Sequence, residues 1–125
     1  MENYHSSQTP SPEEWLELDE SLRIDLVRKS HEVAGVEFKE GAENIHSVIH
    51  VIVENQLAMN VEPVPVTISR LTRQGLSRHE AIHAIGAVLT EDLFEIMKNN
   101  QEHNIKKYRR RLEKLTAKRW NKGKW

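Results

Sequence analysis

Residues 77–98 read SRHEAIHAIGAVLTEDLFEIMK, and their apolar residues recur every three or four positions, the spacing of one helix face. That face carries Ile82, Ile85, Leu89, Leu93 and Ile96. Ser77 followed by Glu80 three residues later is a capping box, which marks a helix start. The pattern therefore predicts a helix over 78–98 that packs one face against the rest of the chain.

The same period recurs on both sides of this segment. It predicts further helices over about 12–34, 42–59, 65–74 and 102–119. No stretch alternates with the period of two that a half-buried strand requires. We therefore expect an all-α fold, a single compact bundle of four to five helices over residues 11–119. Residues 1–10 are expected to be disordered and residues 120–125 to be frayed.

Composition excludes several kinds of protein. The 125 residues include no cysteine, which excludes disulfides, thiolate catalysis and cysteine-based metal sites. Apolar runs such as Val51–Val53 are far shorter than the roughly 20 residues that cross a bilayer. The polar start lacks the order of a signal peptide. We expect a cytoplasmic protein without membrane contact, and leave self-association and a small-molecule substrate open.

Four of the seven histidines form two pairs, His46 with His50 and His79 with His83. Residues four apart on a helix are neighbours, so each pair can hold one ion from consecutive turns. Both pairs flank the apolar faces of their predicted helices, and Gly86 suggests that the two helices approach closely. If the two helices pack there, all four imidazoles converge.

Imidazole nitrogen suits transition metals, and four of them match the tetrahedral preference of zinc. The sequence thus predicts one metal ion, zinc first and iron second, at His46, His50, His79 and His83, with Glu54 as a reserve or orienting ligand. If all four bind, the site is closed and structural. If one is free, water can take its place, and hydrolytic or redox chemistry becomes available.

Three alternatives compete with this site. The run His79-Glu80-Ala81-Ile82-His83 has the zincin protease pattern, but Glu80 also serves the capping box. Glu-x-x-His at Glu43 and at Glu80 suits a di-iron bundle. Histidines that hydrogen-bond to each other, without metal, are the third. His5, His31 and His103 lack such partners and are expected to be solvated.

The segment from Ile45 to Met97 resembles a family of small bacterial proteins catalogued as domain of unknown function 1841. The matching residues are His46, His50, Glu54, Gln56, Leu57, Arg70, Leu71, Gly75, Ser77, Arg78, His79, Ala81, His83, Leu89 and Glu91. The chain departs from the family at Ala42-Glu43, where the family has Asn-Pro. The resemblance implies a role for the four histidines, and for Glu54 and Gln56 as polar groups that bind or orient. It implies no activity.

The formal net charge of −1 hides an uneven distribution, because residues 105–125 hold ten Lys/Arg and one acid. An alternative function is therefore a metal-free nucleic-acid-binding or assembly module that uses this basic helix. Its candidate contacts are Lys106, Lys107, Arg109, Arg110, Arg111 and Lys114. The plainer interpretation is a solvated helix that the acid-rich segment 12–34 neutralises. A helix-turn-helix over 65–98 is disfavoured, because its second helix is long and buried.

Overall fold

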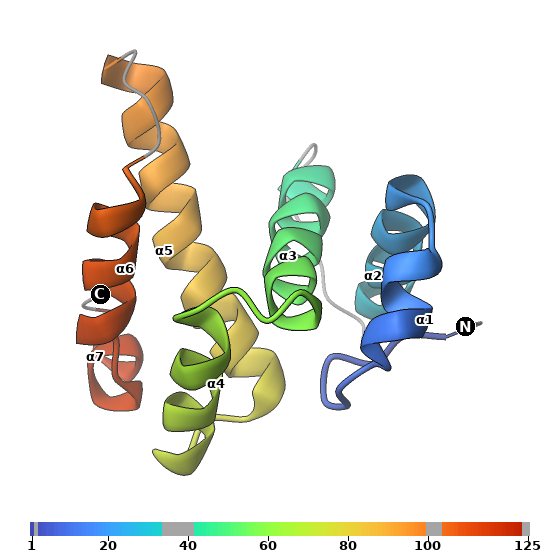
Figure 1. Cartoon of the computed structure of the whole chain (residues 1–125), viewed down its shortest axis with the longest axis horizontal. Helices are drawn as coiled ribbons and strands as arrows, with labels where there is room; N and C mark the ends of the chain where they lie inside the picture. The colour runs from blue at the N-terminus through green and yellow to red at the C-terminus, as the bar shows by residue number, and fades with distance from the viewer. Residues whose placement is uncertain (2, 34–41, 100–103, 124–125) are drawn as a thin grey trace.

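The computed structural model of the chain describes residues 1, 3–33, 42–99 and 104–123 (Figure 1). These residues form helices and no strand, so the predicted all-α class is confirmed. The helices are α1 (Pro12–Glu17), α2 (Glu20–Val33), α3 (Ala42–Ala58), α4 (Val64–Arg73), α5 (Arg78–Asn99), α6 (Ile105–Lys114) and α7 (Ala117–Asn121). Seven helices in the described residues exceed the four to five expected, because two predicted helices are each broken in two. None of these helices is long and apolar enough to cross a membrane.

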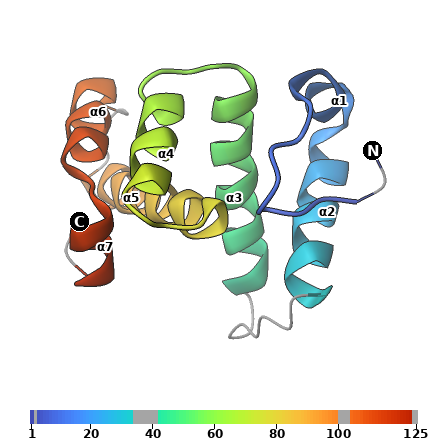
Figure 2. The same cartoon turned by 90° about the horizontal axis from the view of Figure 1, so that it is seen from below.

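Helix α3 lies in the middle of the molecule (Figures 1 and 2). Helices α1 and α2 cover one side of it, α4 and α5 pack on the other, and α6 and α7 lie beyond them. Two apolar clusters result. Val51 of α3 packs with Tyr4, Trp15 and Val27, while Val53 faces the larger cluster of α4, α5 and α6. Because α3 is packed on two sides, it carries apolar side chains on more than one face, as Val51 and Val53 show.

The predicted helix over 12–34 is broken at Leu18, whose backbone is extended. The cause is tertiary. Trp15 donates a hydrogen bond to Asn55 near one end of α3, and His31 packs against His46 near the other end. One straight helix would hold Trp15 and His31 about 24 Å apart, whereas Asn55 and His46 are about 13.5 Å apart along α3. The chain must therefore fold back. The expected stop at Gly35 lies outside the described residues.

The predicted helix over 102–119 is broken in the same way, at Leu115, whose side chain is fully buried. Arg70 of α4 donates to the backbone oxygens of Leu112 and Leu115 at 2.6 and 3.1 Å and so caps the end of α6. Thr116 then begins α7 by accepting a hydrogen bond from the Arg119 amide. The break turns Leu115 into the core. Residues 102 and 103, where this helix was expected to begin, are not described.

Helix α5 begins where its capping residues predict. The Ser77 hydroxyl accepts a hydrogen bond from the Glu80 amide at 3.1 Å. Further along, a Cβ atom added to Gly86 would lie 3.1 Å from Cγ2 of Ile49 on α3. The close approach of the two helices that Gly86 suggested is therefore confirmed, and it sets how near their histidines come.

Candidate metal centre

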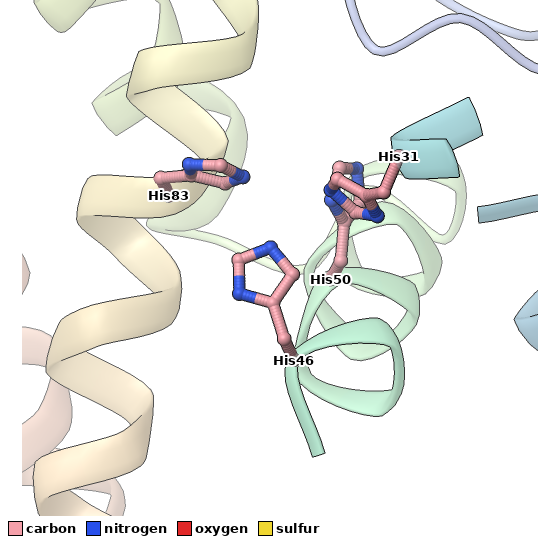
Figure 3. Close-up of side chains that lie close together, drawn as sticks. All are labelled: His31, His46, His50 and His83. Atoms are coloured by element: carbon pink, nitrogen blue, oxygen red, sulfur yellow. The ribbon is translucent and has the colours of Figure 1, made fainter. Parts of the chain in front are cut away.

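Four histidines from three helices converge beside α3 (Figure 3). They are His31 of α2, His46 and His50 of α3, and His83 of α5. Each offers a ring nitrogen, and the four nitrogens lie within 4.8 Å of one another. This spacing is compatible with a metal site.

The cluster depends on helix packing more than on spacing along one helix. The ring centroids of His46 and His50, one turn apart on α3, are separated by 6.4 Å. Across helices, His46 lies only 4.7 Å from His31 and 4.7 Å from His83. The i, i+4 pair supplies two ligands of the set, and the neighbouring helices each supply one.

His31 was expected to be solvated, and that expectation is wrong. Its side chain is 2% exposed and lies inside the cluster. The signal that could have revealed it is the spacing of Ile24, Val27 and His31, which places the three on one helix face. Leu22 of the same helix, by contrast, is half exposed.

His79 was expected among the four ligands, but it lies beside the group of four nitrogens within 4.8 Å of one another and is not a member of it. Its ring centroid lies 4.0 Å from that of His83 and 6.2 Å from that of His50. Its Nδ1 is hydrogen-bonded to the Ser6 hydroxyl. His79 thus packs against three of the four rings, those of His31, His50 and His83, while one of its own nitrogens bonds to Ser6.

Glu54 forms a buried network behind His50. Its side chain is 1% exposed, and both its oxygens accept hydrogen bonds from Arg78, at 2.7 and 2.9 Å. The Tyr4 hydroxyl donates to the same carboxylate and lies 2.7 Å from Nε2 of His50. Tyr4 belongs to the segment expected to be disordered, yet its side chain is only 3% exposed.

This network fixes the tautomer of His50. A hydroxyl carries one proton, and the Tyr4 hydroxyl donates its proton in the hydrogen bond to Glu54. The hydrogen bond between Tyr4 and His50 must therefore be donated by Nε2 of His50 to the Tyr4 oxygen. The lone pair of His50 is then on Nδ1. In the described part of the chain, neither Nδ1 of His50 nor Nε2 of His83 has a hydrogen-bond partner, although both are buried. Both nitrogens are therefore available to a metal ion.

All the clustered imidazoles are held neutral. Burial, reinforced by the neighbouring rings, lowers the pKa of His31 to about 4, of His50 to about 2 and of His83 to about 3. Burial lowers the pKa of His46 and His79 as well. At neutral pH no proton competes with a metal for these nitrogens.

A cleft of about 420 Å³ opens beside the cluster, between α3 and α5. His46, His50 and His83 line it together with apolar side chains, among them Ile45, Ile49, Ile82 and Ala87. The hydroxyl of Thr90, which also lines it, donates to the Gly86 carbonyl. The cleft is therefore an apolar space with imidazoles in its wall.

The other polar residues predicted near the site have other contacts. Gln56 accepts a hydrogen bond from the Tyr108 hydroxyl at 3.2 Å, and Glu80 accepts one from the Trp120 indole at 2.8 Å. Glu80 is exposed, and its charge acts to raise the pKa of His79. A protease base would have to face the metal, whereas the Glu80 carboxylate bonds to Trp120, so this contact disfavours the protease alternative. The side chain of Glu43, needed for the di-iron alternative, lies outside what the structure describes.

The basic α6 does not lie against the acidic α1 and α2, which are at the opposite end of the molecule (Figures 1 and 2). Instead it pairs with α5, where Arg111 contacts Asp92 and Glu95, and Lys107 contacts Glu95. The expected neutralisation by segment 12–34 is therefore wrong. Four further basic residues of α6 are exposed: Lys106, Arg109, Arg110 and Lys114.

The chain matches no protein-family model, no curated protein and no solved structure. The resemblance to the family of domain of unknown function 1841 therefore stays a prediction.

Proposed function

We propose that this protein binds one transition-metal ion through His31, His46, His50 and His83. The observation that carries the proposal is the convergence of four ring nitrogens, within 4.8 Å of one another, from three different helices. The set differs from the one predicted from helix spacing by His31 in place of His79.

A network of hydrogen bonds without metal explains the cluster less well. Buried polar atoms almost always find partners, and each unsatisfied one costs about 1–3 kcal/mol. Nδ1 of His50 and Nε2 of His83 have none among the described residues. A metal ion would satisfy both, and the low pKa values of these rings leave their lone pairs free for it.

Zinc is the first candidate and iron the second. Zinc accepts four nitrogen ligands in a tetrahedron, with Zn–N distances of about 2.0–2.1 Å, so its ligand nitrogens lie about 3.4 Å apart. From their largest separation of 4.8 Å, the ligand nitrogens need to approach by about 1.4 Å to reach that geometry, a change within reach of side-chain rotations. Iron also binds imidazole but favours additional ligands, which the neighbouring cleft has room to admit.

The test is metal analysis of the full chain purified without an affinity tag. We expect close to one zinc or iron per chain, and a melting temperature that falls when a chelator is added. His83→Gln and His46→Gln should lose the metal, whereas His5→Gln, at an exposed histidine outside the cluster, should retain it. Metal-free protein that a chelator does not destabilise, and that binds no added zinc, would refute the proposal.

The alternative, nucleic-acid binding through α6, is favoured by one observation: Lys106, Arg109, Arg110 and Lys114 remain exposed although Asp92 and Glu95 engage their neighbours. Deleting the helix is no fair test, because Leu112 and Leu115 belong to the core. Reversing the charge of Lys106, Arg109 and Arg110 should abolish salt-dependent binding to a generic oligonucleotide. The matched control reverses Lys29, an exposed residue of α2. Binding that survives the triple reversal would reject this alternative.

A further inference from the structure

The cleft beside the histidines has a composition that restricts what can enter it. Its volume of about 420 Å³ lies within the roughly 300–1,000 Å³ of small-molecule sites. Its walls are isoleucine, alanine, glycine and Trp120, and its polar lining includes three histidines. A ligand with many hydroxyls or phosphates would lose its hydration there without new partners.

The charge of the metal centre supplies the second restriction. Four neutral imidazoles leave a divalent ion with its full charge of 2+ in a largely dehydrated place. Among the described residues, Glu54 is connected to the cluster by hydrogen bonds through Tyr4, but its carboxylate is already paired with Arg78. Glu80 is exposed and bonded to Trp120. The bound ion therefore attracts an external anion, and the cleft is the apolar route by which one can reach it.

We infer that the cleft binds a small monocarboxylate with a short aliphatic or aromatic body, its carboxylate on the metal and its body between α3 and α5. This inference rests on the proposed metal site. The single negative charge of the carboxylate offsets half of the 2+ charge of the ion, and the apolar body of the ligand covers Ile45, Ile49 and Ile82. Zinc and its relatives expand from four to five ligands readily, so the carboxylate needs no histidine to leave.

The probe is the full chain loaded with Co²⁺, whose visible absorption reports the number of its ligands. Hexanoate should lower the intensity of the Co²⁺ bands as a fifth ligand enters. It should bind at least about tenfold more tightly than acetate, because burial of its four additional CH₂ groups is favourable. Hexanol, which has the same body without the charge, should leave the spectrum unchanged.

Two variants place the ligand. Ala87→Phe fills the cleft with an aromatic ring at a position that is no metal ligand, so Co²⁺ should still bind while the response to hexanoate is lost. Ser7→Phe is the matched control. It adds the same ring beside the polar cavity on the other side of the cluster, which Ser6, His31 and His79 line, and should leave hexanoate binding intact.

Several results would overturn the inference. Equal affinities for acetate and hexanoate would show that the apolar body makes no contact, and an unchanged response in Ala87→Phe would place the anion elsewhere. A dimer in sedimentation velocity that Ala87→Phe converts to monomers would show that a second copy of the chain fills the cleft. Failure of the proposed metal site is distinguishable, because Co²⁺ would then not bind before any carboxylate is added.

Discussion

Tyr4 connects a buried carboxylate to a candidate metal ligand. The Tyr4 hydroxyl donates a hydrogen bond to Glu54 and accepts one from Nε2 of His50. It therefore orients the His50 ring and leaves the lone pair of that ring on Nδ1. Its ring also packs against Trp15, with centroids 5.3 Å apart. The hydroxyl and the ring thus have separable roles.

Tyr4→Phe removes the hydroxyl and keeps the ring, so we expect the protein to fold normally. We also expect its zinc affinity to fall about 10–100-fold, the usual effect of losing a group that orients a ligand. Competition with a chromophoric chelator measures this. The control is Tyr108→Phe, which removes a hydroxyl bonded to Gln56 instead. Equal zinc affinity in wild type and Tyr4→Phe would contradict the orienting role.

His31 and His79 separate the ligand set of the structure from that of the sequence pattern. His31→Gln should abolish stoichiometric zinc binding, because it removes a member of the four-nitrogen group. His79→Gln should retain the ion with reduced affinity, since His79 packs against His83 and bonds to Ser6. Zinc stoichiometry by elemental analysis decides. Zinc retained in His31→Gln and lost in His79→Gln would instead support the ligand set predicted from helix spacing.

At the scale of helices, Gly86 controls the distance between α3 and α5. A Cβ atom there would lie 3.1 Å from Cγ2 of Ile49, so Ile49 would have to move within the interface of the helices that carry His46, His50 and His83. Gly86→Val should therefore lower the free energy of unfolding by about 1–3 kcal/mol and weaken zinc binding as well. Urea denaturation and chelator competition measure the two effects. Ala87→Val, one residue along the same helix, is the control, and equal effects of both variants would argue against close approach at Gly86.

Local patterns predicted which segments are helical, because capping residues and apolar period act within a few residues of each other. Neither pattern revealed the breaks at Leu18 and Leu115. Both breaks depend on partners distant in sequence: Asn55 and His46 for the first, Arg70 for the second. The same division holds in the site. His46, His50 and His83 were identified from spacing, whereas His31 has no second histidine four residues away in the sequence and joins the cluster only when α2 packs on α3.

For the whole molecule, burying neutral histidines makes stability depend on pH. Their pKa values are lowered on folding, to about 4 for His31 and about 2 for His50, so below pH 6.5 the unfolded chain binds more protons than the folded one. The contribution of these histidines to the free energy of unfolding is fully present above about pH 6.5 and decreases as the pH falls towards 4. Each of these two histidines, both 2% exposed, contributes a slope of about 1.4 kcal/mol per pH unit.

We therefore expect the metal-free protein to have a clearly lower urea midpoint at pH 5 than at pH 7.5, and no further gain from pH 7.5 to 8.5. Chelator is present throughout, so that metal loss does not contribute. His50→Leu removes one titrating group and should flatten the dependence. A midpoint that is constant from pH 7.5 to pH 5 would contradict neutral burial of the histidines.

The position of α3 between two separate apolar clusters has a consequence for cooperativity. The N-terminal layer, with Tyr4, Trp15 and Val27, meets the larger cluster mainly through α3, and Ser6 adds hydrogen bonds to Arg78 and His79 of α5. His31 belongs to that layer and His83 to the other, so one bound ion would tie the two halves together. With the ion, heat should melt the chain in a single calorimetric transition. Once the ion is removed, the amides of α2 should exchange with solvent before those of α5, because the smaller half can then open alone.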